Sequence, residues 1–97
     1  MDFAFYRNFI TVAETGNLSA AAKRLGIVQP ALSAQMKAIE RNYGVQLFKM
    51  QRGKRHIELT EAGETFLQQA RQLCNTEDDI SLRMQAFGRR AAGTLRF

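Results

Sequence analysis

The sequence has a single cysteine, Cys74, a single proline, Pro30, and no tryptophan. One cysteine cannot form a disulfide within the chain, and the absence of CxxC pairs and of a second histidine leaves no zinc-site pattern. No apolar run is long enough to span a bilayer and no signal peptide opens the chain, so we expect no membrane contact and a reducing, cytoplasmic setting. Neither a nucleophile–base pair nor a phosphate-cradling glycine-rich loop is recognisable, which argues against an enzyme and against a bound cofactor.

Positive charge is concentrated in the first part of the chain. The 97 residues carry a net charge of +5 and are 45% hydrophobic, which fits one small folded domain with an appended helix. Residues 1–60 contain nine basic and four acidic residues, whereas residues 61–97 contain five of each. The excess in the first part is expected if it meets a polyanion, and a solvated basic surface is the alternative.

Hydrophobic periodicity predicts two helices before residue 26. The first runs from Phe3 to Thr15, with Asp2 as its N-cap and Gly16 as its stop. One stripe of this helix is apolar: Phe3, Tyr6, Phe9, Ile10 and Ala13. The second is short, spans Ala20–Leu25, and has Ser19 as its N-cap. Its alanines allow another helix to approach closely.

A third helix is predicted from Gln29-Pro30 to Tyr43, before Gly44. Proline is well suited to the first turn, where a missing N–H leaves no bond unmade. The inward stripe consists of Leu32, Met36, Ile39 and Tyr43. The outward side consists of Gln29, Ser33, Ala34 and Lys37. Two short helices joined by a tight glycine-containing turn, the second with a polar outer face, are typical of a helix-turn-helix.

A short β-hairpin is predicted after the third helix. Val45, Leu47 and Phe48 precede a glycine-bearing loop, and Ile57 and Leu59 follow it. The loop carries three cations, namely Arg52, Lys54 and Arg55. Their density favours phosphate contact over a merely solvated loop.

A long helix is predicted from Glu61 to about Phe87, with Thr60 as its N-cap. Apolar residues recur along it at alternating spacings of four and three, interrupted by Glu77: Phe66, Ala70, Leu73, Ile80, Met84 and Phe87. We call these six residues the seam. Because the helix would overhang a 60-residue domain, we expect the seam to pair with a second copy, and folding back onto its own domain is the alternative. Cys74, beside Leu73, is expected to be buried packing.

The order and spacing of several motifs resemble the N-terminal domain of LysR-type bacterial transcription regulators. The resemblance covers about residues 1–63, and the motifs are Ala20–Leu25, Val28–Ser33, Ile39-Glu40, Gly44-Val45, Leu47-Phe48 and Leu59–Gly63. It implies a mainly α, winged helix-turn-helix fold, with three helices and a small hairpin wing, followed by a long dimerisation helix. It also implies sequence-specific binding of double-stranded DNA, as a dimer on an interrupted inverted repeat.

The resemblance further implies roles for individual residues. Gln29, Pro30, Ser33 and Lys37 lie where the family's third helix contacts DNA, and the carboxamide of Gln29 matches the N6 and N7 atoms of adenine. Arg52, Lys54 and Arg55 lie in the wing. At Ala34 the family commonly has arginine, so the usual contact is not transferred. Alanine can contact a thymine methyl, and no base contact at this position is the alternative.

The resemblance also suggests a division of the chain and of its parent. Residues 1–60 would be the DNA-binding domain, 61–88 the linker helix, and 89–97 a hinge leading into an effector-binding domain that is not in this sequence. The full-length parent is expected to bind a small-molecule effector there and to form tetramers. The competing function is a winged-helix protein-interaction module that does not read DNA.

Overall fold

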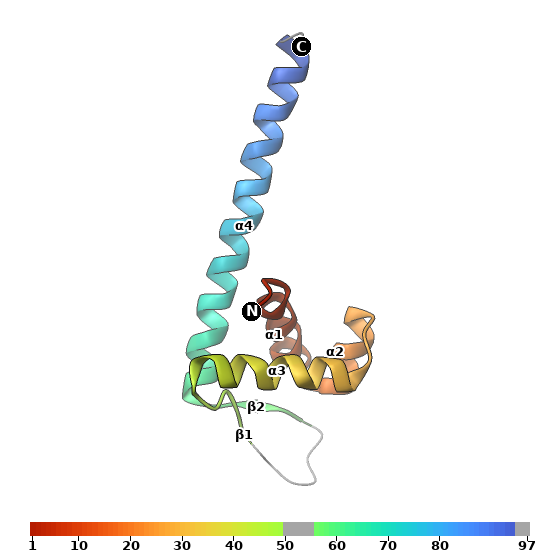
Figure 1. Ribbon diagram of the computed structural model, residues 1–97, viewed down its shortest axis with the longest axis vertical. Coiled ribbons are helices and arrows are strands. Elements are labelled where there is room, and N and C mark those ends of the chain that lie inside the picture. Colours follow the sequence, from red (N-terminus) through yellow and green to blue (C-terminus); the bar gives the residue numbers. More distant parts are fainter. Residues whose placement is uncertain (50–55, 95–97) are drawn as a thin grey trace.

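The computed structural model describes residues 1–49 and 56–94, with four helices and a two-stranded antiparallel hairpin in those ranges. Helices α1 (Ala4–Thr15), α2 (Leu18–Leu25) and α3 (Gln29–Tyr43) form a small domain with strands β1 (Phe48–Lys49) and β2 (Glu58–Leu59). Helix α4 (Glu61–Thr94) projects from it as a rod (Figure 1). The molecule therefore measures 62 × 25 × 19 Å. This is the winged helix-turn-helix with a long final helix that the sequence predicted.

The core lies between the three short helices and the hairpin. Its buried side chains come from the three short helices and from the residue before β1: Phe9, Val12, Ala21, Ala22, Leu32, Met36, Ile39 and Leu47. The Phe9 ring lies at the centre, with centroids 5.3 Å from Phe48 and 4.7 Å from Phe66. The small Ala21 and Ala22 let α2 pack closely on α1 and α3, as the alanine-rich sequence predicted.

The start of α2 differs from the prediction. The helix begins at Leu18, two residues before the expected Ala20, and its cap is Asn17, whose side chain accepts a hydrogen bond from the Ala20 amide at 2.9 Å. Asn17 has the extended backbone of an N-cap, and asparagine is as good a cap as serine. Predicting Ser19 as the cap was therefore wrong, and its hydroxyl is left for another partner. Helix α1 begins at Ala4, one residue after the predicted Phe3, and Phe3 occupies the N-cap position without a side-chain hydrogen bond. The Asp2 carboxylate, predicted as the N-cap, accepts from the Ala4 amide at 3.1 Å.

Two apolar assignments were also wrong. Val12 is fully buried although it lay outside the predicted stripe of α1, whereas Tyr43 remains 47% exposed instead of joining the core. The Tyr43 hydroxyl lies 2.6 Å from that of Tyr6, and its ring packs 5.6 Å from Phe66. This hydrogen bond is the main reason why the pKa of Tyr6 is raised. Tyr43 thus covers the edge of the core and keeps its polar end in solvent.

Helix α4 begins as predicted and continues further. Thr60 caps it by accepting from the Gly63 amide at 3.0 Å, and Gly63 allows a close approach, because a Cβ atom there would lie 2.1 Å from the Leu47 carbonyl oxygen. The helix ends at Thr94, beyond the predicted end near Phe87, so residues 89–94 are helical where a linker was expected. Gly88 has open space around it and does not interrupt the helix.

Candidate nucleic-acid interface

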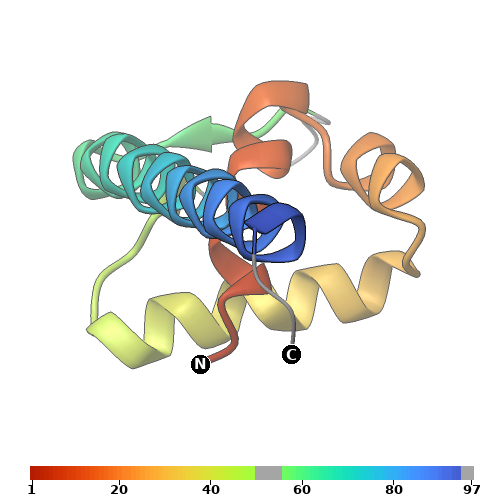
Figure 2. The same ribbon diagram turned by 90° about the horizontal axis from the view of Figure 1, so that it is seen from above.

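The two faces of α3 have opposite environments. Leu32, Met36 and Ile39 are buried in the core, as predicted. On the other side Gln29, Pro30, Ala34 and Lys37 are exposed, and Ser33 is half-buried. Figure 2, looking along α4, shows α3 lying along one edge of the domain. The five residues expected to contact DNA therefore share a surface that the core does not use, which we call the outward face of α3.

The first turn of α3 presents an exposed polar group beside small apolar ones. Val28 precedes the helix in extended conformation, provides no side-chain cap and is 69% exposed. Gln29 is bonded across the helix-turn-helix, since the Ser19 hydroxyl of α2 donates to Gln29 Oε1 at 2.6 Å. With Pro30, Ala31 and Ala34 exposed as well, this end can make one carboxamide contact and several methyl or methylene contacts.

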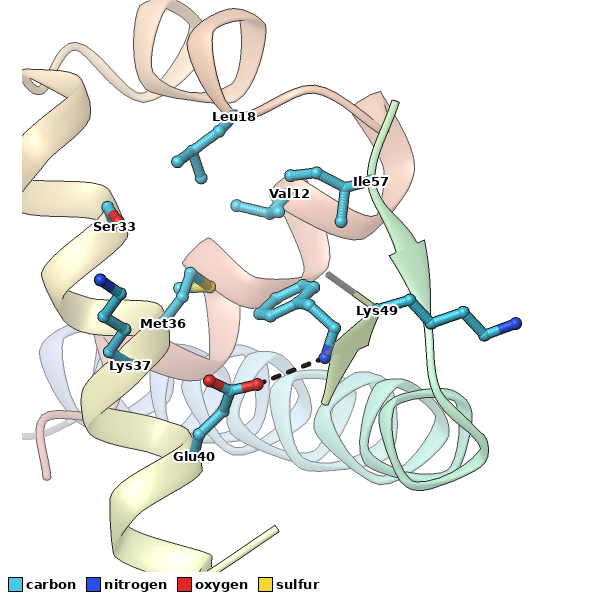
Figure 3. Close-up of a pocket in the computed structure, with 9 residues that line it drawn as sticks. Val12, Leu18, Ser33, Met36, Lys37, Glu40, Lys49 and Ile57 are labelled. Atoms are coloured by element: carbon cyan, nitrogen blue, oxygen red, sulfur yellow. Dashed lines mark hydrogen bonds between the residues drawn. The ribbon is translucent and has the colours of Figure 1, made fainter. Parts of the chain in front are cut away.

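Further along α3, Ser33 and Lys37 border a cavity of about 320 Å³ between α3 and the hairpin. In Figure 3 the two side chains lie one turn apart on α3, while Met36 points across the cavity toward Val12. Lys49 of β1 lies on the same rim and forms an ion pair with Glu58, with Lys49 Nζ 3.7 Å from Glu58 Oε1. Lys49 is thus a further cation near the outward face that sequence reasoning counted as charge but did not assign to the interface.

The orientation of α3 is fixed by polar contacts that the sequence did not reveal. Glu40 Oε2 accepts from the backbone amides of Leu47 and Phe48, at 2.8 and 3.3 Å, and so ties α3 to the start of β1. Figure 3 draws one of these bonds as a dashed line from Glu40. Nearer the middle, Asn8 of α1 donates to Gln35 Oε1 at 2.6 Å. Glu40 belongs to the Ile39-Glu40 motif of the family resemblance, but its sequence position gave no sign of these partners. These bonds hold α3 as a rigid element, which precise contacts to a ligand require.

The hairpin is attached to the turn between α1 and α2. Phe48 pairs with Leu59 and Lys49 with Glu58, and the Ile57 amide donates to the Gly16 carbonyl at 2.8 Å. Gly16 has a φ of +69°, and the His56 ring lies where its Cβ would be. The histidine therefore packs on the turn, as a structural residue would. The predicted phosphate contacts Arg52, Lys54 and Arg55 lie outside the described residues.

The seam on α4 divides into two parts. Phe66 packs against the core and Ala70 is 1% exposed, so both face their own domain. The remaining four residues are open to solvent: Leu73 at 41%, Ile80 at 54%, Met84 at 56% and Phe87 at 58% exposed. The first part of the seam therefore folds back onto its own domain, as the alternative expected. The second part is an exposed apolar row, which we call the distal seam.

Ion pairs between α1 and α4 mark where the two parts of the seam meet. Arg7 of α1 bonds to Glu77 and, at 2.9 Å, to Asp78, and Arg71 lies 3.4 Å from Glu14. The polar interruption of the seam at Glu77 is therefore occupied by a partner within the chain. Beneath it Cys74 is buried, as expected, and this burial raises the pKa of its thiol.

Two further searches concern other classes of function. Among the described residues, no group of three or more His, Cys, Asp or Glu side chains is arranged to hold a metal ion. In the same part of the chain, none of the helices combines the length and the hydropathy needed to cross a membrane.

A family model and individual relatives both identify similar proteins among helix-turn-helix regulators. Residues 4–64 match the family described as bacterial regulatory helix-turn-helix protein, lysR family. The chain is 46% identical to the HTH-type transcriptional regulator ClcR of Pseudomonas putida over 96 residues, which is 99% of the chain and 32% of ClcR. It is 37% identical over 95 residues to the regulator BsdA of Bacillus subtilis, covering 98% of the chain and 32% of BsdA. The chain thus spans about a third of the length of these relatives.

Solved structures match the fold closely. The CbnR DNA-binding domain in complex with DNA superposes with a TM-score of 0.83 at 42% identity, over 91% of this chain and 99% of that one. The BenM DNA-binding domain on benA site 1 DNA gives 0.83 at 32% identity, over 90% and 99%. Full-length BenM matches with a TM-score of 0.80 at 33% identity, over 88% of this chain and 27% of that one.

Proposed function

The chain belongs to the LysR family of bacterial regulatory helix-turn-helix proteins, and from this premise we propose that it binds specific double-stranded DNA sequences through the outward face of α3. The observation that carries the proposal is the division of α3: Leu32, Met36 and Ile39 are locked in the core, while a row of polar and small side chains is left exposed. A helix with such a face on the edge of a domain fits the major groove of B-DNA. That two structural neighbours are DNA complexes supports this use of the fold.

Each residue of the outward face has a role suited to its chemistry. Gln29 presents a carboxamide that pairs with the N6 and N7 atoms of adenine, and Pro30 and Ala34 offer apolar contacts to thymine methyl groups. Lys37 neutralises a backbone phosphate. Ser33, half-buried beside the cavity, donates to a phosphate or to a base edge. The wing cations Arg52, Lys54 and Arg55 add sequence-independent affinity for the DNA backbone.

The distal seam would bind a second copy of the chain. Leu73, Ile80, Met84 and Phe87 repeat at heptad-like spacing, and each is more than two-fifths exposed. Pairing two such helices places two α3 helices on a common two-fold axis. We therefore expect the recognised DNA to be an interrupted inverted repeat whose two half-sites are equivalent.

The whole protein, of which this chain would be a part, is proposed to regulate transcription. The relatives named above are transcriptional regulators about three times longer than the chain. A further domain that binds a small-molecule effector, a tetrameric assembly and action in the cytoplasm, where bacterial DNA lies, complete the proposal. The chain itself would be a binding module, with no catalytic role.

Selection from a library of random duplexes, followed by sequencing, tests the proposal. The expected result is enrichment of an inverted repeat with two equivalent half-sites. A matched selection with Gln29→Ala should lose information at one position in each half-site and keep it elsewhere. If neither selection enriches any motif, while the chain binds a protein partner in a salt-insensitive manner, the function is that of a protein-interaction module.

A further inference from the structure

The hydrogen bond between Ser19 and Gln29 joins α2 to α3 but caps neither helix. The cap of α2 is Asn17, not Ser19, and α3 has no side-chain cap at Val28. Ser19 and Gln29 are both exposed, and the distance from Ser19 Oγ to Gln29 Oε1 is 2.6 Å. The Ser19 hydroxyl does not cap α2, and it binds instead the Gln29 side chain, to which we assign the base contact.

We propose that Ser19 is a positioning residue for base recognition: it holds the Gln29 carboxamide in the orientation in which that group meets the DNA base. The inference rests on the proposed DNA binding of α3. It adds a residue of α2, which does not itself touch the base, to the determinants of sequence specificity.

Both residues of the Ser19–Gln29 hydrogen bond lie on helical backbone that packs against the core. Ser19 lies in the first turn of α2, between the Asn17 cap and the buried Ala21 and Ala22. Gln29 is the first residue of α3, three positions before the fully buried Leu32. The hydrogen bond therefore fixes the flexible part that lies between them, the dihedral angles of the glutamine side chain. A glutamine loses much rotamer freedom when it is immobilised, and fixing it before DNA binds reduces that loss on binding.

The bond leaves the carboxamide able to recognise a base. A carboxamide oxygen has two lone pairs, of which Ser19 occupies one, and both Nε2 hydrogens remain available. The second lone pair can accept from adenine N6 while Nε2 donates to N7, which is the bidentate contact expected of glutamine. The serine hydroxyl and the base edge can thus bind the same side chain together.

Four variants test this role: Ser19→Ala, Ser19→Thr, Gln29→Ala and the double variant Ser19→Ala/Gln29→Ala. Each is titrated at one salt concentration with three duplexes. These are a duplex carrying the repeat selected by the unmodified chain, the same duplex with the Gln29-dependent base pair exchanged, and a duplex of unrelated sequence. Thermal unfolding of each variant reports whether the fold is intact.

Ser19→Ala is expected to weaken binding of the selected duplex by roughly 2- to 10-fold, the range of one net hydrogen bond. Binding of the unrelated duplex should not change. Discrimination at the exchanged base pair should fall, and Ser19→Thr, which keeps the hydroxyl, should restore it. In the Gln29→Ala background, Ser19→Ala should have no effect, because the group that it positions is missing.

Equal weakening on the selected and unrelated duplexes would overturn the inference, since it would make Ser19 a direct backbone contact. Tighter binding by Ser19→Ala would overturn it as well, because the hydrogen bond would then compete with DNA. An undiminished effect in the Gln29→Ala background would do the same. These results leave the proposed function standing, whereas the absence of any preference of the unmodified chain for the selected duplex refutes that function itself.

Discussion

The outward face of α3 and the distal seam of α4 are both surfaces that the domain does not bury, yet they differ in chemistry. The face of α3 carries a carboxamide, a hydroxyl, an ammonium group and small apolar groups. The distal seam carries Leu73, Ile80, Met84 and Phe87, each more than two-fifths exposed. A polar face with donors and acceptors suits base edges and phosphates, whereas exposing a large apolar row to water costs free energy until another apolar surface covers it.

This difference in chemistry suits the outward face of α3 to DNA recognition and the distal seam of α4 to dimerisation. Under the proposed function, contacts on α3 would set which sequence is bound, and contacts on α4 would set how many copies bind and at what spacing. The ion pairs of Arg7 with Glu77 and Asp78 stand between the two and hold α4 against α1. Changes confined to one surface should therefore leave the property assigned to the other unchanged.

The largest expected effect comes from placing charge in the distal seam. Leu73→Asp/Ile80→Asp should dissociate the dimer, because two buried aliphatic side chains contribute about 3–6 kcal/mol, or roughly 100- to 10,000-fold in the dimer dissociation constant. Sedimentation equilibrium measures this. Leu82→Asp is the matched control, since Leu82 is 64% exposed but lies opposite the seam, and its dimer should persist. If the double variant is still a dimer, the distal seam is not the dimer interface.

The next prediction compares alanine substitutions at two glycines of α4, Gly63 and Gly88. Gly63→Ala should destabilise the domain by about 1–3 kcal/mol, because the new Cβ meets the Leu47 carbonyl oxygen. Gly88→Ala adds its methyl group to open space and should instead stabilise the helix by about 0.5–1 kcal/mol. Urea denaturation monitored by circular dichroism gives both values. Equal effects of the two substitutions would mean that α4 does not approach the hairpin as described.

The smallest effect concerns a single cation on α3. Lys37→Ala should weaken binding to selected and unrelated DNA alike and reduce the slope of log K against log[salt] by about 0.9, the value for one phosphate. Fluorescence anisotropy over a series of salt concentrations measures the slope. Arg83→Ala is a suitable control, because Arg83 lies on α4, away from α3, and pairs there with Asp79. An unchanged slope for Lys37→Ala would exclude its phosphate contact.

Much of this architecture could be predicted from local signals. Gly26 and Gly44 adopt left-handed conformations at the predicted helix ends, and the inward positions Leu32, Met36 and Ile39 are buried as their spacing required. Periodicity and stop signals act within one element, so a single sequence is enough to recognise them.

The features that we could not predict from the sequence depend on contacts between helices and strands. The choice of Asn17 over Ser19 as the cap of α2 is a contest between two good caps two residues apart. Glu40 binds amides seven and eight positions further along the chain. Phe66 and Ala70 face their own domain, and the regular spacing of the seam did not indicate that it divides into a packed part and an exposed part. These outcomes depend on how α4, the hairpin and α3 meet in space.

The most direct test of the account compares Gln29→Ala with the unmodified chain on its selected duplex and on an unrelated one, at equal salt. The account predicts a loss of about 1–3 kcal/mol on the selected duplex and almost none on the other. Asn42→Ala, which removes an exposed carboxamide at the far end of α3, should change neither. Equal losses of Gln29→Ala on both duplexes would contradict the claim that the outward face of α3 recognises bases.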